Sequence, residues 1–291
     1  MVSVIIYLAL TIFGAVLGSF AGATVWRLRA HQLQHDKKEG RKVDANEFKR
    51  LKGLLKDDLA HDRSRCLNCG YTLKWYDLVP LVSWLSLGGK CRQCHQPIGL
   101  YEPLIEAGVA SYFVVSYAFW PFELSSPLAV AQFIAWLIAG VCFAIQFSYD
   151  FKWSLLDSRV SYILIGLGLI SAVITIVQSN SPWAAALSAF WSVFIFGGIY
   201  LGVWAISRKR WIGEGDVVLG LALGLLLANW ENAFLGLFLA NFIGCLIVIP
   251  QMARRKLTTN SRIPFGPLLI LGAIIAQLVG PVIIGAYLNL L

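Results

Sequence analysis

Long uncharged apolar runs constrain this chain more than any other feature. A helix needs about 20 apolar residues to cross a bilayer core, and eight segments are candidates, although the sixth is short and must begin near Gly213 or Asp216 to cross. Of the 291 residues, 58% are hydrophobic and 14% are charged, which excludes an ordinary soluble globular domain. The sequence therefore predicts an all-α polytopic membrane protein with about eight transmembrane helices. The expected spans are Val2–Val25, Pro103–Trp120, Pro127–Tyr149, Val160–Val177, Trp183–Ile206, Val217–Ala228, Ala233–Gln251 and Pro264–Leu290.

The basic residues indicate how these spans are oriented. All 24 Lys and Arg residues fall in four alternate connections, and the intervening turns carry none. Because basic loops stay in the cytosol, we expect these connections to be cytosolic and both termini to lie outside. The net charge of +8 is then mainly an orientation signal, so membrane lipid is an expected partner and nucleic acid is not. The basic connections are Arg27–Arg92, Lys152–Arg159, Arg208–Arg210 and Arg254–Arg262.

Two C-x2-C pairs lie in the longest polar stretch. Four thiolates at this spacing can close tetrahedrally around one zinc ion. The alternatives are two disulfides, free thiols or a redox pair, and a reducing cytosol favours zinc over disulfides. Four cysteine ligands leave no open position, so the predicted zinc is structural and holds together a small domain with little apolar mass. The predicted ligands are Cys66, Cys69, Cys91 and Cys94.

Two aspartates stand at the edges of apolar spans. Asp150 ends the third span, and Asp216 opens the sixth after Gly213 and Gly215. An ionisable group at a membrane boundary is costly and indicates function, and two such acids can share one proton and activate water against a peptide carbonyl. Glycine lets an extended substrate backbone approach closely. Each acid also has a simpler interpretation, because Asp216 can cap its helix and Asp150 can be a solvated helix end.

Further motifs accompany these acids and cysteines along nearly the whole chain. They are Gly18-Ser19-Phe20 with Trp26-Arg27-Leu28, Ser64-Arg65-Cys66, Trp75-Tyr76-Asp77, Pro80-Leu81-Val82-Ser83-Trp84, Gly89-Lys90-Cys91, Gly213-Glu214-Gly215-Asp216 and Ile263-Pro264-Phe265-Gly266-Pro267. With them the chain resembles the type IV prepilin peptidases, also called prepilin leader peptidases, which belong to the GxGD-type intramembrane aspartyl proteases.

This resemblance implies an activity. The family's two catalytic aspartates carry over onto Asp150 and Asp216. The implied reaction removes a short basic leader, after a glycine, from type IV prepilins or type II secretion pseudopilins at the cytosolic face of a bacterial inner membrane. Methylation of the new N-terminal amine by S-adenosylmethionine is implied as a second step. The expected parts are a first transmembrane helix (1–26), a cytosolic domain with a charged helical insert and the zinc site (27–102), and a seven-helix membrane protease domain (103–291).

The resemblance also implies roles for other residues. Gly89 and Lys90, beside the second cysteine pair, are candidates for binding the methyl donor, although Lys90 can equally be a solvated cation that compensates the charge of the zinc thiolates. Glu106, Gly213 and Gly215 are candidates for contacting the substrate, although Glu106 can equally be a hydrogen-bonded acid at a helix start. The family's Leu-Pro-Asp turn is replaced by Leu155-Leu156-Asp157, which lacks the proline.

Other functions fit parts of the pattern. An ion- or proton-coupled transporter with a zinc-binding cytosolic module would also carry intramembrane acids, but it predicts them near mid-membrane and with internal repeats. A general intramembrane protease shares the acid pair without needing the cysteine domain. The small-residue repeats Gly14-x3-Gly18 and Gly220-x3-Gly224 are expected to pack helices within the chain.

Overall fold

The computed structural model describes residues 2–55, 63–208, 210–254 and 263–290. Within these residues the secondary structure is helical apart from two isolated β-bridges, which confirms the all-α prediction. The chain divides into two compact units, Met1–Val115 and Ser116–Leu291.

The first unit is organised around one long helix. Its elements are α1 (Val2–Lys38), α2 (Ala45–Leu51), η1 (Lys52–Leu54), η2 (Trp75–Asp77), α3 (Val82–Ser86) and α4 (Tyr101–Ala118), whose last residues pass into the second unit. A Cβ atom added to Gly14 would lie 2.8 Å from the Cα of Ala110, and one on Gly18 would lie 2.7 Å from the Cα of Glu106. These glycines therefore bring the backbones of α1 and α4 into contact, as their spacing predicted.

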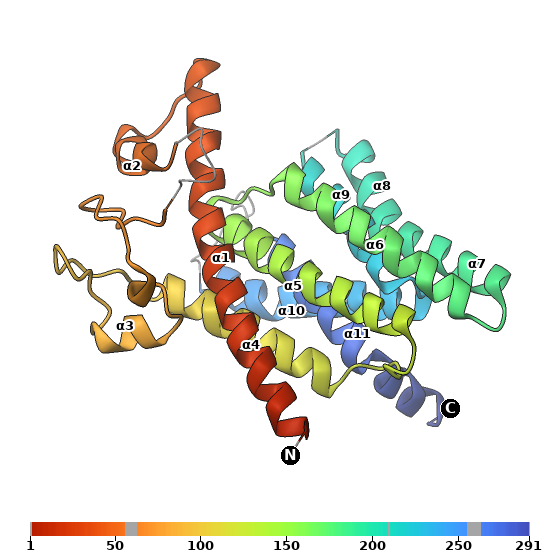
Figure 1. The fold of residues 1–291 in the computed structure, drawn as a ribbon. Helices are drawn as coiled ribbons and strands as arrows, with labels where there is room; N and C mark the ends of the chain where they lie inside the picture. Colours follow the sequence, from red (N-terminus) through yellow and green to blue (C-terminus); the bar gives the residue numbers. More distant parts are fainter. Residues whose placement is uncertain (1, 56–62, 209, 255–262, 291) are drawn as a thin grey trace. The chain divides into compact units, whose positions relative to one another are not determined.

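The charged segment after the first span is partly helical, as expected. The long helix α1 continues to Lys38, and α2 begins after Asp44, whose side chain accepts hydrogen bonds from two backbone N–H groups of the first turn. α2 and η1 pack back on α1 (Figure 1), with Leu51 of α2 and Leu54 of η1 in one apolar cluster with Leu33 of α1. Residues 56–62 of the predicted insert lie outside the described residues.

The second unit is a helical bundle (Figure 1). α9 packs against α6, α7 and η3, while α10 packs against α11. Gly220 and Gly224 of the second glycine repeat lie where α9 contacts α7 and η3. This position confirms their predicted role in helix packing. The elements are α5 (Pro127–Trp153), α6 (Ser158–Gln178), α7 (Pro182–Val193), η3 (Phe194–Gly198), α8 (Ile199–Ile206), α9 (Glu214–Leu227), α10 (Trp230–Ala253) and α11 (Gly266–Leu288).

Six helical segments of the described chain are long and apolar enough to cross a membrane. They are α1, α5, α6, α10, α11 and the continuous helix formed by α7, η3 and α8. The other two expected spans form α4 and α9. The glutamates Glu102 and Glu106 lower the hydropathy of α4, and the 14 residues of α9 extend only about 21 Å at about 1.5 Å per residue.

Candidate active site and metal centre

Asp150 lies in the last turn of α5 and is buried, with 5% of its surface exposed. Its Oδ2 atom accepts a hydrogen bond of 2.9 Å from the backbone N–H of Gly266, the first residue of α11. A Cβ atom on Gly266 would lie 2.9 Å from the same oxygen. The glycine thus lets the carboxylate reach the backbone and fixes the end of one helix to the start of another.

Asp216 is the third residue of α9, and Gly213 is the N-cap with an extended backbone. The carboxylate of Asp216 lies beside this glycine, with Oδ2 3.4 Å from an ideal Cβ position on Gly213. The N-cap is thus Gly213 and not Asp216, which is an acidic residue of the first turn, where the helix dipole favours a negative charge. Asp216 also interacts electrostatically with Asp150, so the two predicted acids come together within the second unit.

A leucine in the connection between α5 and α6 joins the two acidic segments. A Cβ atom on Gly215 would lie 2.9 Å from the Cβ of Leu156, and one on Gly266 would lie 3.2 Å from the Cδ2 of Leu156. Leu156 therefore contacts the residue before Asp216 and the residue bonded to Asp150.

The connection that carries Leu156 is fixed from inside α5. The fully buried side chain of Gln146 donates to the carbonyl of Asp157 at 2.8 Å and accepts from its N–H at 3.0 Å. Asp157 in turn caps α6 by accepting from the N–H of Arg159 at 2.9 Å. The sequence did not indicate these roles for Leu156 and Gln146. The one available signal was Gln146, an uncharged polar residue inside an apolar span.

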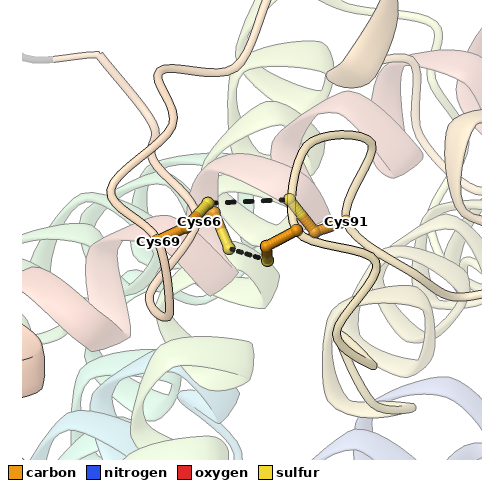
Figure 2. Close-up of side chains that lie close together, drawn as sticks. Cys66, Cys69 and Cys91 are labelled. Atoms are coloured by element: carbon orange, nitrogen blue, oxygen red, sulfur yellow. Dashed lines mark hydrogen bonds between the residues drawn. The ribbon is translucent and has the colours of Figure 1, made fainter.

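The four cysteines lie together in the first unit (Figure 2). Their sulfur atoms all lie within 4.8 Å of one another, and the Sγ–Sγ distances are 3.9 Å for Cys66 and Cys94 and 4.0 Å for Cys69 and Cys91. All four are free thiols. The cluster can therefore hold a metal ion, as the paired spacing predicted.

Two similar backbone turns present these sulfurs. In the first turn the N–H of Cys66 donates to the carbonyl of Tyr71 at 2.9 Å, and in the second the N–H of Cys91 donates to the carbonyl of Gln96 at 2.9 Å. The turns close with Gly70 at a φ of 73° and His95 at a φ of 54°. The repeated pattern explains why two short motifs suffice to build the site.

The thiols differ in how readily they ionise. The pKa of Cys94 is lowered to about 6, chiefly because the backbone N–H of Gln96 donates to its sulfur, with a further contribution from the Asn68 amide. Burial raises the pKa of the Cys91 thiol. A metal ion would therefore meet one thiolate that forms readily at neutral pH and would displace a proton from Cys91.

Asp77 connects the two turns. Its side chain is 3% exposed and accepts from Arg92 Nε at 2.8 Å and from the backbone N–H of Lys74 at 3.1 Å. Burial alone raises the pKa of Asp77, but the hydrogen bonds from Arg92, Lys74 and Tyr71 and the charge of Arg92 outweigh it and hold the pKa below its ordinary value.

The remaining predicted site residues lie in the first unit. Gly89 has a φ of 70°, and a Cβ atom there would lie 2.8 Å from the indole of Trp84, whereas Lys90 is exposed. Glu106 is buried and accepts a hydrogen bond of 2.7 Å from the N–H of Leu81, so it ties α4 to the loop before α3. Gly89 and Glu106 thus have structural contacts of their own, and the binding roles of these three residues stay predictions.

The fold and the two sites define a polytopic membrane protein with an acidic pair, of which Asp150 is buried, and a four-cysteine centre. Residues 12–120 match the family model described as "Bacterial Peptidase A24 N-terminal domain", and residues 133–249 match "Type IV leader peptidase family". No solved structure is a significant match to the chain.

Curated relatives agree with these matches. A "Type 4 prepilin-like proteins leader peptide-processing enzyme" of Escherichia coli is 31% identical over 91% of this chain and 90% of its own length. Two proteins named "Prepilin leader peptidase/N-methyltransferase" are each 27% identical: one from Pseudomonas aeruginosa, over 96% of this chain and 92% of its own length, and one from Legionella pneumophila, over 97% and 94%. The chain therefore belongs to the type IV leader peptidase family and is a multi-pass inner-membrane peptidase.

Proposed function

We propose that this protein removes the basic leader of type IV prepilins or type II secretion pseudopilins with Asp150 and Asp216 as its catalytic pair. The observation that carries the proposal is the electrostatic interaction between these two carboxylates. Leu156 supports it by contacting both Gly215, next to Asp216, and Gly266, whose N–H donates to Asp150. Membership of the leader peptidase family supports the substrate class.

The chemistry follows from two carboxyl groups that share one proton. The ionised carboxylate takes a proton from a water molecule as the water oxygen attacks the carbonyl carbon of the scissile bond. The protonated carboxyl donates its proton to the carbonyl oxygen. Collapse of the tetrahedral intermediate then breaks the C–N bond, and the proton first taken from water passes to the leaving amine.

The position of the acids at helix ends suits a substrate that is itself a membrane helix. A helical peptide bond is protected because its carbonyl is engaged, so cleavage at the edge of the substrate helix needs less unwinding. We propose that this edge meets Gly213 and Gly215 at the cytosolic boundary, with the basic leader outside the bilayer core. Gly213 is exposed, is extended and carries no side chain to keep the substrate backbone away from Asp216.

The four-cysteine centre fits structural zinc. A tetrahedral site with Zn–S distances of about 2.3 Å has sulfur–sulfur edges of about 3.8 Å, close to the 3.9 and 4.0 Å found here. Bound zinc would cross-link the two turns, and four thiolates leave no position for catalysis. The ligands are Cys66, Cys69, Cys91 and Cys94.

We further propose that the chain methylates the new N-terminus with S-adenosylmethionine, as the printed names of the relatives from Pseudomonas aeruginosa and Legionella pneumophila state for those proteins. Gly89 and Lys90 remain the proposed contributors to donor binding. A methyl-transfer assay with Lys90→Ala tests this role, because a solvated cation would leave the rate unchanged.

The test of the peptidase function uses purified full-length protein and a prepilin in detergent. We expect Asp150→Asn and Asp216→Asn each to lower kcat by about 10⁴-fold, as removal of an essential catalytic group does. Glu214→Gln, which alters the exposed neighbour in the same motif, serves as the matched control and should retain wild-type activity. Cleavage at the wild-type rate by either aspartate variant would contradict the proposal.

A further inference from the structure

The helix formed by α7, η3 and α8 runs antiparallel to α9 at very close range. A Cβ atom on Gly224 would lie 2.7 Å from the Cα of Val193, and one on Gly220 would lie 2.6 Å from the carbonyl oxygen of Phe196. Going from Gly224 to Gly220, four residues toward the N-terminus of α9, therefore moves the contact about four residues toward the C-terminus of the partner helix. The next step in this register pairs Asp216 with Tyr200.

Direct interactions agree with this register. Tyr200 is buried, with 6% of its surface exposed, although it lies in a helix that packs largely through small residues. Its side chain interacts electrostatically with Asp216. The π-helical turn Phe194–Gly198 ends two residues before Tyr200 and rotates the following residues relative to an uninterrupted α-helix. Turns of this kind often occur at functional sites.

Tyr200 also contacts the segment that holds the other acid. Its ring lies 5.9 Å, centroid to centroid, from the ring of Phe265. Phe265 is the N-cap of α11 and immediately precedes Gly266, whose N–H donates to Asp150. Tyr200 therefore packs against the segment that binds Asp150 and interacts electrostatically with Asp216.

Asn241 and Asp216 are the two polar groups that interact with the Tyr200 side chain. The side-chain amide of Asn241 bonds to the Tyr200 hydroxyl, and the same amide nitrogen donates to the carbonyl of Leu237 at 2.8 Å. An amide nitrogen has two protons, and a phenol oxygen can accept one hydrogen bond while donating its own proton. The acidic group that interacts electrostatically with Tyr200 is Asp216.

We propose that Tyr200 is a positioning residue of the peptidase site, whose hydroxyl is oriented by Asn241 and holds the carboxylate of Asp216 toward Asp150. This inference rests on the proposed function and adds a third polar group to the site. If Tyr200 were needed only to pack its ring against Phe265, phenylalanine at position 200 would serve equally well. The hydroxyl is the part that acts on catalysis.

The experiment compares prepilin cleavage by Tyr200→Phe, which keeps the ring, with Tyr162→Phe, which removes a hydroxyl from an exposed position of α6. For Tyr200→Phe we expect kcat to fall about 10- to 100-fold, because misplacement of a catalytic group by about 1 Å costs up to about 100-fold. KM should stay within about twofold, since no substrate contact is lost. Tyr162→Phe should match the wild type.

Asn241→Leu provides a second variant, because Asn241 is exposed and its replacement does not disturb a buried core. We expect a smaller fall in kcat, and we expect the double variant to be no slower than Tyr200→Phe alone, since both changes act through one hydroxyl. Wild-type kcat for Tyr200→Phe, or independent effects in the double variant, would overturn the inference. Asp216→Asn in the same assay separates the two claims: if it cleaves normally, the proposed function itself fails.

Discussion

In the four-cysteine centre, the two sulfurs of each close pair come from residues at most 28 positions apart, whereas the hydrogen bond that holds Asp150 spans 116 positions. The first site is assembled by two short turns with the same hydrogen-bonding pattern. The second requires the ends of α5, α9 and α11 and the connection between α5 and α6. The cysteine centre should therefore depend on its metal, and the acidic site on the packing of helices.

The largest expected effect follows from removing one ligand of the four-cysteine centre. Cys91→Ala removes one ligand, and we expect the variant to lose its bound zinc and with it about 10 kcal/mol of folding free energy in the region around the two turns. Protease digestion of that region and metal analysis by mass spectrometry measure the loss. Cys245→Ala removes an exposed thiol from α10 and should keep one zinc per chain. A Cys91→Ala protein that retains the full metal content would show that the centre does not bind as described.

The next effect tests the assembled site. In Gly266→Ala the new methyl group would press on Oδ2 of Asp150, which lies 2.9 Å from an ideal Cβ position. We expect kcat for prepilin cleavage to fall about 100-fold, because the carboxylate must move. Gly285→Ala is the matched control in the same helix, since nothing lies within 4 Å of its Cβ position. Equal rates for both variants would remove Gly266 from the site.

A smaller effect concerns the ion pair between the turns. Asp77→Asn should lower the stability of the first unit by about 1 to 2 kcal/mol, because Arg92 is partly exposed and can be rehydrated. The pKa of Asp77 in the folded protein lies below its ordinary value of 3.8. The contribution of the ionised Asp77 to stability is therefore complete at pH values above 3.8. It is lost only as the pH falls through the lower pKa that Asp77 has in the folded protein.

Thermal unfolding of the zinc-loaded proteins measures this contribution. Between pH 6 and pH 8, roughly two or more pH units above the ordinary pKa, the stability difference between wild type and Asp77→Asn should stay constant. A difference that changes across this interval would assign the effect to another titrating group.

The smallest expected effect tests whether the two cysteine turns have equivalent backbone conformations. His95 has a positive φ at the place where the first turn has Gly70. Relief of left-handed strain in His95→Gly outweighs the larger entropy of glycine in the unfolded chain, so we expect a gain of about 0.5 kcal/mol. Gly70→Ala should cost about 1 kcal/mol for the same reason. Calorimetric unfolding measures both, and a loss of stability in His95→Gly would contradict the equivalence.

The sequence sufficed to predict the local parts of the molecule. The C-x2-C spacing predicts the cysteine cluster because each turn is set by neighbouring residues. The positions of Asp150 and Asp216 at the edges of apolar runs, together with the resemblance to the peptidase family, predict an acidic pair. The six described helices that can cross a membrane lie at six of the eight expected spans.

The contacts between helices could not be predicted in the same way. Helices that are apolar on all sides have no hydrophobic face, so the sequence does not indicate which side chains point inward. In the sequence Tyr200 is one aromatic residue in an apolar run, and the π-helical turn before it has no clear sequence pattern. Gly266 belonged to a recognised motif, but its bond to Asp150 depends on how α11 meets α5.

Whether Asp150 and Asp216 act as one unit can be measured by comparing single-turnover cleavage by Asp150→Asn, Asp216→Asn and the double variant. If the two carboxyls share one proton and one reaction, all three proteins should cleave prepilin at the same residual rate. If the double variant instead loses activity by the product of the two single losses, the acids act independently and the proposed pair is wrong.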